Sequence, residues 1–310
     1  MPRVALIGAG LVGRSWAMVF ARAGWEAVLY DPTAGVTGQA LGLIRDGLED
    51  QARHGLVDDP KAALARISAA PGLAAVLADC DYVQESGPEQ LEAKRAIWAE
   101  LDRLTPDGVV IASSTSAITA SRFSETLGGR ARCLVGHPVN PPHLVPLVEI
   151  SPAPWTSGEA VERARQVYAG IGQTPILVKK EIDGFILNRL QGAVLNEALR
   201  LVGAGYVSAA DLDKTIKDGL GLRWSFMGPF ETIELNAPAG IPDYCARFEG
   251  MYRAMAQMPP GEQVWDQANI DRIVADWGPA PAPEAVRAKS RWRDLRLAAL
   301  AAHKKSQPKG

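Results

Sequence analysis

The stretch VALIGAGLVG, residues 4–13, decides the fold of this chain. It is a short apolar run that ends in the pattern Gly-x-Gly-x-x-Gly, and a helical pattern and a second apolar run closed by Asp31 follow it. Strand, glycine turn, helix, strand and acid in this order are typical of a dinucleotide-binding unit. We expect Gly8 to permit the tight turn, Gly10 to leave room for a pyrophosphate, and Gly13 to let the helix pack against the strand.

The start of this helix and the acid downstream predict which cofactor binds. Free backbone N–H groups and the helix dipole would face the phosphates. A carboxylate at Asp31 can accept hydrogen bonds from the adenosine ribose and repels a 2′-phosphate, and Pro32 follows it instead of an arginine, so we expect NAD and not NADP. The predicted cofactor-binding residues of the motif are Gly8, Gly10, Leu11, Val12, Gly13 and Asp31.

Length and composition narrow the class of protein. The chain has 310 residues, enough for two domains, and a net charge of −2, which favours neither a nucleic-acid nor a membrane-surface partner. Its three cysteines form no C-x-x-C pair, so we expect neither disulfides nor a metal site. We see no segment long enough to span a bilayer and no signal peptide, and therefore expect a cytoplasmic protein.

The chain changes character near residue 181. Apolar strands and amphipathic helices alternate over residues 1–181, which predicts an α/β, Rossmann-like, doubly wound and mostly parallel sheet covered on both faces. Residues 182–310 show only helical patterns and predict an all-helical second domain. That domain begins with a long helix bearing an apolar stripe, including Ile186, Leu190 and Val194, and we expect this stripe to be buried in a homodimer.

Histidine is the commonest proton acceptor when a nicotinamide cofactor oxidises an alcohol, and the chain has four. His54 lies at a mixed-charge helix end and His303 in a basic tail, and both are interpreted as surface residues. His137 and His143 lie in a stretch with several prolines, predicted to be a loop after a strand, at the edge of a doubly wound sheet where ligands bind.

Three polar residues could assist such a histidine. A carboxylate from Glu149 could fix the tautomer of His137 and stabilise its protonated form. Asn140 and Asn188, in Pro-rich and apolar surroundings, could hold a substrate oxygen. From composition alone, a capping or packing role for Asn188 is the preferred interpretation.

Several motifs together are similar to those of the 3-hydroxyacyl-CoA dehydrogenase family over nearly the whole chain. The sequence most resembles its lambda-crystallin branch, which implies L-gulonate 3-dehydrogenase activity. The motifs shared with the family are the glycine motif (8–13), STS (114–116), HPVNP (137–141), VE (148–149) and GFILNRL (184–190). Those shared with the branch are GRSWAM (13–18), HPVNPP (137–142), GLGLR (219–223), GPFET (228–232) and WRD (292–294).

The resemblance implies catalytic roles for four of these residues. His137 would be the general base, oriented by Glu149. Ser116 and Asn188 would bind the reacting oxygen of the substrate near His137.

The resemblance also implies further cofactor contacts. Asn140 and Ser116 would lie near the nicotinamide, and Glu89 and Lys94 would contact the cofactor elsewhere. Without the resemblance, Glu89 and Lys94 are interpreted as an ordinary helix N-terminus, where the dipole favours an acid.

The distribution of charged residues narrows the range of possible substrates. Acyl-CoA enzymes of this family carry several lysines on the helix after the second strand, whereas residues 31–59 here contain only Arg45 and Arg53 as cations among many acids. Arg223 lies in a segment that those enzymes lack, and its planar guanidinium suits the carboxylate of a small 3-hydroxy acid. A surface role for Arg223 is almost as plausible.

Two alternatives to L-gulonate stay open. The substrate could be carnitine, with Trp224 against its quaternary ammonium, or a 3-hydroxyacyl-CoA. The chain could instead be a non-catalytic, NAD-binding structural protein like a crystallin. The presence of both His137 and Glu149 argues against that class.

Overall fold

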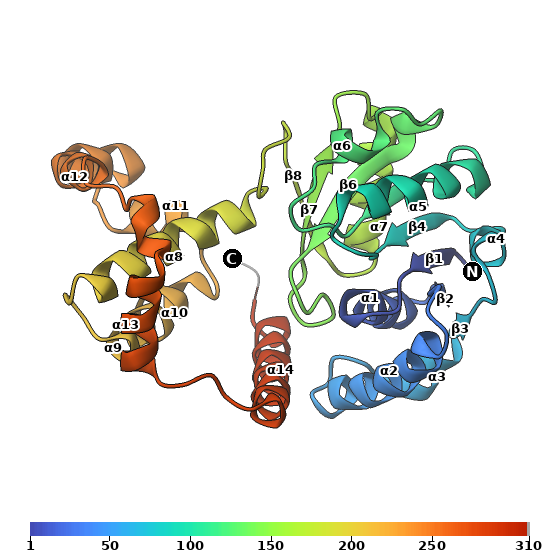
Figure 1. Ribbon diagram of the computed structural model, residues 1–310, viewed down its shortest axis with the longest axis horizontal. Coiled ribbons are helices and arrows are strands. Elements are labelled where there is room, and N and C mark those ends of the chain that lie inside the picture. Colours follow the sequence, from blue (N-terminus) through green and yellow to red (C-terminus); the bar gives the residue numbers. More distant parts are fainter. Residues whose placement is uncertain (309–310) are drawn as a thin grey trace. The chain divides into compact units, whose positions relative to one another are not determined.

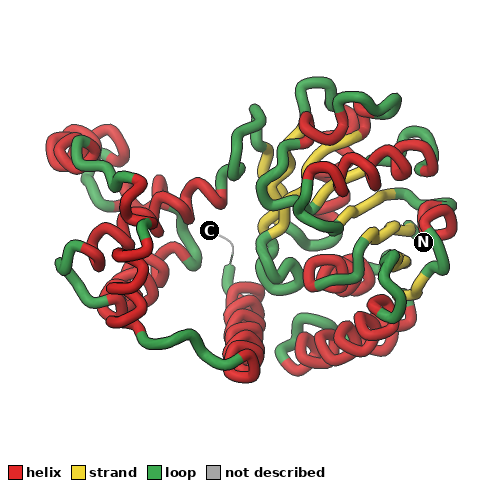
Figure 2. The backbone as a smooth tube through the Cα atoms, viewed as in Figure 1, coloured by secondary structure: helices red, strands yellow, loops and turns green. Residues whose placement is uncertain are grey.

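The computed structural model describes residues 1–308, which form two compact units (Figures 1 and 2). The first comprises residues 1–187 together with the chain from Ala288 onward, and the second is Asn188–Arg287. The sequence division at residue 181 had put all of 182–310 in the helical domain. The difference at the C-terminus arises because α14 (Pro283–Ser306) reaches the first unit, where Arg291 lies 3.8 Å from Asp50.

An eight-stranded sheet forms the centre of the first unit (Figure 1). Its order is β3-β2-β1-β4-β5-β6-β7-β8, and every neighbouring pair is parallel except β6 with β7, which confirms the predicted doubly wound fold. The strands are β1 (Arg3–Ile7), β2 (Glu26–Tyr30), β3 (Ile67–Ala69), β4 (Tyr82–Glu85), β5 (Ile111–Ser113), β6 (Cys133–Pro138), β7 (Leu147–Pro152) and β8 (Thr174–Leu177).

Successive residues of each strand point to opposite faces of the sheet, and helices bury both faces. Val4 and Leu6 face one apolar core with helices α1, α2, α3 and α7, whereas Ala5 and Ile7 face a second core with α4, α5 and α6. The sheet is therefore covered on both sides, as the alternating sequence pattern predicts. These helices are α1 (Leu11–Arg22), α2 (Val36–Arg53), α3 (Pro60–Ala65), α4 (Leu73–Leu77), α5 (Leu91–Leu104), α6 (Ala120–Ser124) and α7 (Gly158–Gly170), with a helical turn η1 (Arg130–Arg132).

One sequence-based assignment was wrong where it matters for function. The segment Gly136-His137-Pro138, expected to be loop because of its prolines, is the end of strand β6. Proline is tolerated there because a terminal strand position needs no further ladder bond from its nitrogen. His137 consequently lies on a buried strand and not on a loop.

The second unit is helical throughout, and none of the helices in residues 1–308 is long and apolar enough to cross a membrane. Its first helix, α8, is amphipathic, yet none of its residues is buried. The helices of this unit are α8 (Leu187–Gly203), α9 (Ala209–Lys214), η2 (Thr215–Leu220), α10 (Gly221–Trp224), α11 (Pro229–Leu235), α12 (Gly240–Ala256), η3 (Glu262–Trp265) and α13 (Gln267–Trp277), ahead of α14.

Candidate active site

The three glycines of the motif differ in the space around them. Gly8 has φ of +97°, and a Cβ there would lie 2.5 Å from the Ser86 oxygen. A Cβ on Gly13 would lie 1.8 Å from the Gly8 oxygen, whereas one on Gly10 would meet nothing within 4 Å. Gly8 and Gly13 are thus required by the turn and its packing, and the free space beside Gly10 suits a phosphate group at the start of α1.

Asp31 closes strand β2 beside this turn. One carboxylate oxygen accepts a hydrogen bond from the Ala9 N–H at 2.9 Å, and the other accepts one from Thr33 N–H at 2.9 Å. A cavity of about 570 Å³ opens here, with room for the adenosine half of a dinucleotide. Its lining includes Gly8, Gly10, Tyr30, Asp31, Pro32, Ser86, Pro88 and Ile97.

Glu85, which lines this cavity, forms a buried ion pair with Lys94. The Lys94 ammonium lies 2.8 Å from a carboxylate oxygen of Glu85, and both side chains are 1% exposed. Glu85 also accepts hydrogen bonds from Gly87 N–H at 2.6 Å, from the Ser113 hydroxyl at 2.6 Å and from Trp98 Nε1–H at 3.1 Å. Lys94, expected to contact the cofactor, is thus paired inside the protein with Glu85, a residue that lines the cavity and also holds the Gly87 backbone.

Glu89 precedes helix α5, which begins at Leu91 and not at residue 89. Its carboxylate accepts a hydrogen bond from the Thr115 hydroxyl and from the backbone N–H groups of Ser116 and Ala117, at 3.2 and 3.1 Å. Glu89 therefore fixes the turn that follows strand β5. The exposed side chain of Ser116 is carried on that turn.

His137 and Glu149 are direct partners across the antiparallel β6–β7 pair. Directly opposed residues on neighbouring strands present their side chains on the same face. The His137 Nδ1 atom lies 2.7 Å from Glu149 Oε2, and the two side chains are 7% and 0% exposed. The pairing proposed from spacing alone is confirmed as a contact, and its cause is the strand register. The pair lies at the carboxyl end of β6, the same edge of the parallel strands as Gly8.

The second carboxylate oxygen of Glu149 is held by the start of the helical region. Glu149 Oε1 accepts hydrogen bonds from the backbone N–H groups of Ile186 and Leu187, at 2.8 and 2.9 Å. Burial opposes ionisation of Glu149, but the hydrogen bonds from His137, Leu187 and Ile186 outweigh it and lower the pKa of the carboxyl group. The ring of Phe185 lies 5.4 Å from the imidazole, between ring centres.

This geometry leaves one imidazole nitrogen for chemistry. Because ionised Glu149 only accepts hydrogen bonds, His137 must carry its proton on Nδ1, and Nε2 then has the lone pair that can accept a proton. A buried carboxylate next to the imidazole also stabilises its protonated form. An imidazole held in this way can accept a proton at Nε2.

Other candidate residues lie in different surroundings. The exposed Asn140 follows β6, and Asn188 is the half-buried second residue of α8, next in the chain after Leu187. Arg223 is exposed on α10 of the second unit. The Nδ1 atom of His143 lies 3.1 Å from the Ser15 hydroxyl of α1. His143 forms no hydrogen bond with His137 or Glu149.

Sequence reasoning missed several contributors to the site. Glu85 belongs to no motif that would single it out, although it binds Lys94, and the amides of Ile186 and Leu187 carry no side-chain signal at all. Phe185 could have been suspected, because it lies after Gly184 at the point where strand pattern gives way to helix pattern. It takes a left-handed φ of 48°, which turns the chain into α8.

Comparison with known proteins assigns this architecture to a family. The family description "3-hydroxyacyl-CoA dehydrogenase, NAD binding domain" matches residues 3–182, and "3-hydroxyacyl-CoA dehydrogenase, C-terminal domain" matches residues 184–276. The chain belongs to the 3-hydroxyacyl-CoA dehydrogenase family. Its cofactor is NAD, as the glycine motif and Asp31 predict.

Two curated relatives are similar to this chain over most of its length, and one solved structure shares its fold. A mouse (Mus musculus) lambda-crystallin homolog is 41% identical over 99% of this chain and 98% of its own length. An L-carnitine dehydrogenase of Streptomyces coelicolor is 40% identical over 77% of this chain and 74% of its own. The crystal structure of 5-formyl-3-hydroxy-2-methylpyridine 4-carboxylic acid (FHMPC) 5-dehydrogenase has the same fold. Its TM-score is 0.83, with 99% of this chain and 100% of that chain covered, and the two sequences are 23% identical.

Proposed function

We propose that this protein oxidises a small 3-hydroxy acid to the 3-oxo acid with NAD, and that L-gulonate, oxidised to 3-dehydro-L-gulonate, is its substrate. The observation that carries the proposal is the buried His137–Glu149 pair, 2.7 Å apart at the ligand-binding edge of an NAD-binding sheet. A structural NAD-binding protein has no need to bury a histidine and an ionised carboxylate there, since burying charge without a function costs stability.

In the proposed mechanism, His137 Nε2 takes the proton of the substrate 3-hydroxyl group while Glu149 holds Nδ1–H and stabilises the imidazolium. The amides of Ile186 and Leu187 keep Glu149 ionised and in place. Ser116, on the turn fixed by Glu89, and Asn188 at the start of α8 would orient the reacting oxygen. Bound NAD supplies the hydride acceptor.

Charge supports a free acid over a CoA ester. The two cations between residues 31 and 59 are already paired with carboxylates, Arg45 with Asp46 at 3.2 Å and Arg53 with Asp50. A CoA polyphosphate would have to compete with those carboxylates, so this helix offers it little compensation. Arg223 has no carboxylate partner among residues 1–308, and we propose that it binds the substrate carboxylate.

A second candidate substrate is carnitine, also a free 3-hydroxy acid. The 40% identity to an L-carnitine dehydrogenase supports it, and Trp224, 41% exposed beside Arg223, offers an aromatic face to a quaternary ammonium.

We also propose that the protein is a homodimer joined through α8. Leu190, Val194 and Leu195 are 62%, 39% and 41% exposed on this helix. Contiguous apolar surface of this kind is typical of a subunit interface.

The test is NADH formation from L-gulonate, L-carnitine, 3-hydroxybutyrate and 3-hydroxybutyryl-CoA by the wild type and His137→Ala. We expect turnover of L-gulonate, with kcat reduced about a thousandfold in the variant because general-base catalysis contributes 10²–10⁴-fold. His303→Ala, an exposed histidine in α14, is the control and should keep its kcat. Turnover of the CoA ester alone would overturn the free-acid assignment, and equal kcat in His137→Ala would overturn the mechanism.

Arg223→Leu tests the carboxylate contact separately. It should raise KM for the free acid about tenfold or more with little change in kcat, because an arginine–carboxylate pair contributes to binding in both ground and transition states. Arg253→Leu, an exposed arginine of α12, is the matched control. Unchanged KM in Arg223→Leu would return this residue to a surface role.

A further inference from the structure

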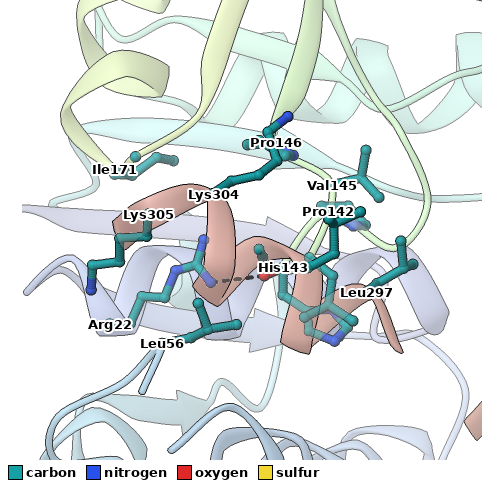
Figure 3. A pocket seen from close by; sticks show the side chains of 14 residues that line it. Arg22, Leu56, Pro142, His143, Val145, Pro146, Ile171, Leu297, Lys304 and Lys305 are labelled. Carbon is teal, nitrogen blue, oxygen red and sulfur yellow. Dashed lines mark hydrogen bonds between the residues drawn. The ribbon is translucent and has the colours of Figure 1, made fainter. Parts of the chain in front are cut away.

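The first unit contains a second cavity, of about 480 Å³, that shares no lining residue with the cofactor cavity or the His137–Glu149 pair. Figure 3 shows its walls: the end of α1, the segment that follows β6, the turn after α7, and the last part of α14. All of these belong to the same compact unit.

The walls of the cavity are aliphatic. Among residues 1–308, no aromatic ring other than the His143 imidazole lines it, so no ring there would stack with a nucleobase. The surface suits a flexible hydrocarbon chain, which gains free energy simply by leaving water. The aliphatic residues include Leu56, Leu144, Val145, Ile171, Leu297 and Leu300.

Three cations border these aliphatic walls. Arg22, Lys304 and Lys305 line the cavity, with Arg22 and Lys305 together at the end opposite Leu297 in Figure 3. No aspartate or glutamate lines the cavity, and within residues 1–308 no carboxylate forms an ion pair with any of the three. The lining of this cavity therefore carries positive charge. Two acids, Asp58 and Asp59, line an adjoining cavity that shares Arg22 and Lys305 with it, and within residues 1–308 they form no ion pair with either.

Arg22 is held firmly in position. One of its guanidinium nitrogens, Nη1, donates to the Gln51 side-chain oxygen at 2.9 Å and to the His143 carbonyl at 2.8 Å, the latter drawn as a dashed line in Figure 3. Both partners are neutral. Burial lowers the pKa of Arg22 to about 10, since its charge is only partly compensated by these dipoles. An anion arriving from solution would supply the missing compensation.

We propose that this cavity is a binding site for an amphiphilic carboxylate, an unbranched aliphatic chain with a carboxylate head, that is separate from the active site. The chain would lie against the aliphatic residues of α14 and of the segment 142–146, and the head would bind between Arg22, Lys304 and Lys305. The cavity volume lies within the range of small-molecule sites. A sugar acid fits less well, because the walls offer few partners for hydroxyl groups.

The test is calorimetric titration of the full-length protein with decanoate below its micelle concentration, in parallel with acetate and with decyltrimethylammonium. We expect saturable binding of decanoate at one site per chain and no measurable binding of acetate, which lacks the aliphatic chain, or of decyltrimethylammonium, which has the chain but carries a positive charge. Absence of saturable decanoate binding, or equal binding of the decyl cation, would overturn the proposal.

Variants locate the binding site. Lys304→Gln/Lys305→Gln removes two exposed cations at little risk to folding and should weaken decanoate binding about fivefold, a modest effect because exposed ion pairs are weak. Leu300→Asp should abolish it by repulsion. The control is Lys179→Gln/Lys180→Gln, two adjacent exposed lysines outside the cavity, which should bind as the wild type does. Equal weakening by both double variants would mean nonspecific charge attraction and would overturn the site.

Discussion

The two compact units of this protein differ in how they bury apolar surface. In the first, two cores flank the sheet and strands such as β1 are almost wholly inaccessible. In the second, one hundred residues long, large apolar side chains stay exposed, Phe230 at 71% and Tyr206 at 73% among them. The buried residues of this unit are Ala209, Thr232, Ala237, Val264 and Asn269.

The difference shows that amphipathic helices do not guarantee a core. Helices of the first unit bury their stripes because a sheet supplies a second apolar layer, and a layered domain needs such a partner. Helix α8 has an apolar stripe as strong as those of α1 and α2, yet no residue of it is buried in the single chain. We infer that the second unit finds its missing layer in another subunit.

The largest expected effect is on association through the exposed apolar stripe of α8. Replacing Leu190 and Val194 with aspartate would bury two unpaired charges in the proposed dimer interface, and should weaken association by a thousandfold or more, about 4 kcal/mol. Sedimentation velocity measures the dimer fraction. Ala193→Asp, an exposed position on the other face of the same helix, is the control; if both variants associate equally, α8 is not the interface.

A smaller effect is expected from a matched pair of glycine substitutions in the first unit. Gly13→Ala forces a methyl group to within 1.8 Å of a backbone oxygen and should reduce the free energy of unfolding by about 3 kcal/mol. Gly10→Ala meets no atom within 4 Å and should leave stability within about 1 kcal/mol while weakening NAD binding. Urea unfolding and NADH fluorescence separate the two. Equal loss of stability in both variants would contradict the proposed division of roles.

The smallest effect concerns a half-buried base of the first unit. Burial, with Arg22, Arg14 and Arg293 nearby, lowers the pKa of His143 from 6.5 to about 4. Between these values the unfolded chain binds the extra proton, so stability falls as pH drops from 6.5 to 4 and the loss reaches about 2.5 kcal/mol at pH 4.5.

His143→Gln should flatten this acid dependence, whereas the exposed His303→Gln should not. Urea unfolding at pH 7.5, 5.5 and 4.5 measures it. A slope unchanged in His143→Gln would assign the acid sensitivity to other groups.

Local patterns were sufficient for much of the fold. The glycine motif, Asp31 and the alternation of apolar strands with helices depend on neighbours within a few turns of chain, and they predicted the NAD-binding sheet. Short pieces were missed: β3, three residues long, has too little sequence for a period to be visible. The prolines around His137 concealed the end of β6, because their local preference was outweighed by pairing with β7.

Residue types and short spacings are enough to identify the class of this protein, since the turn at Gly8 and Gly13, the choice of NAD and the candidate base His137 follow from them. How the site is assembled depends instead on tertiary contacts. Register across β6 and β7 joins His137 to Glu149, and chain folding brings Lys94 to Glu85 and α14 back to the first unit. These contacts depend on packing between distant segments, which local propensity does not encode.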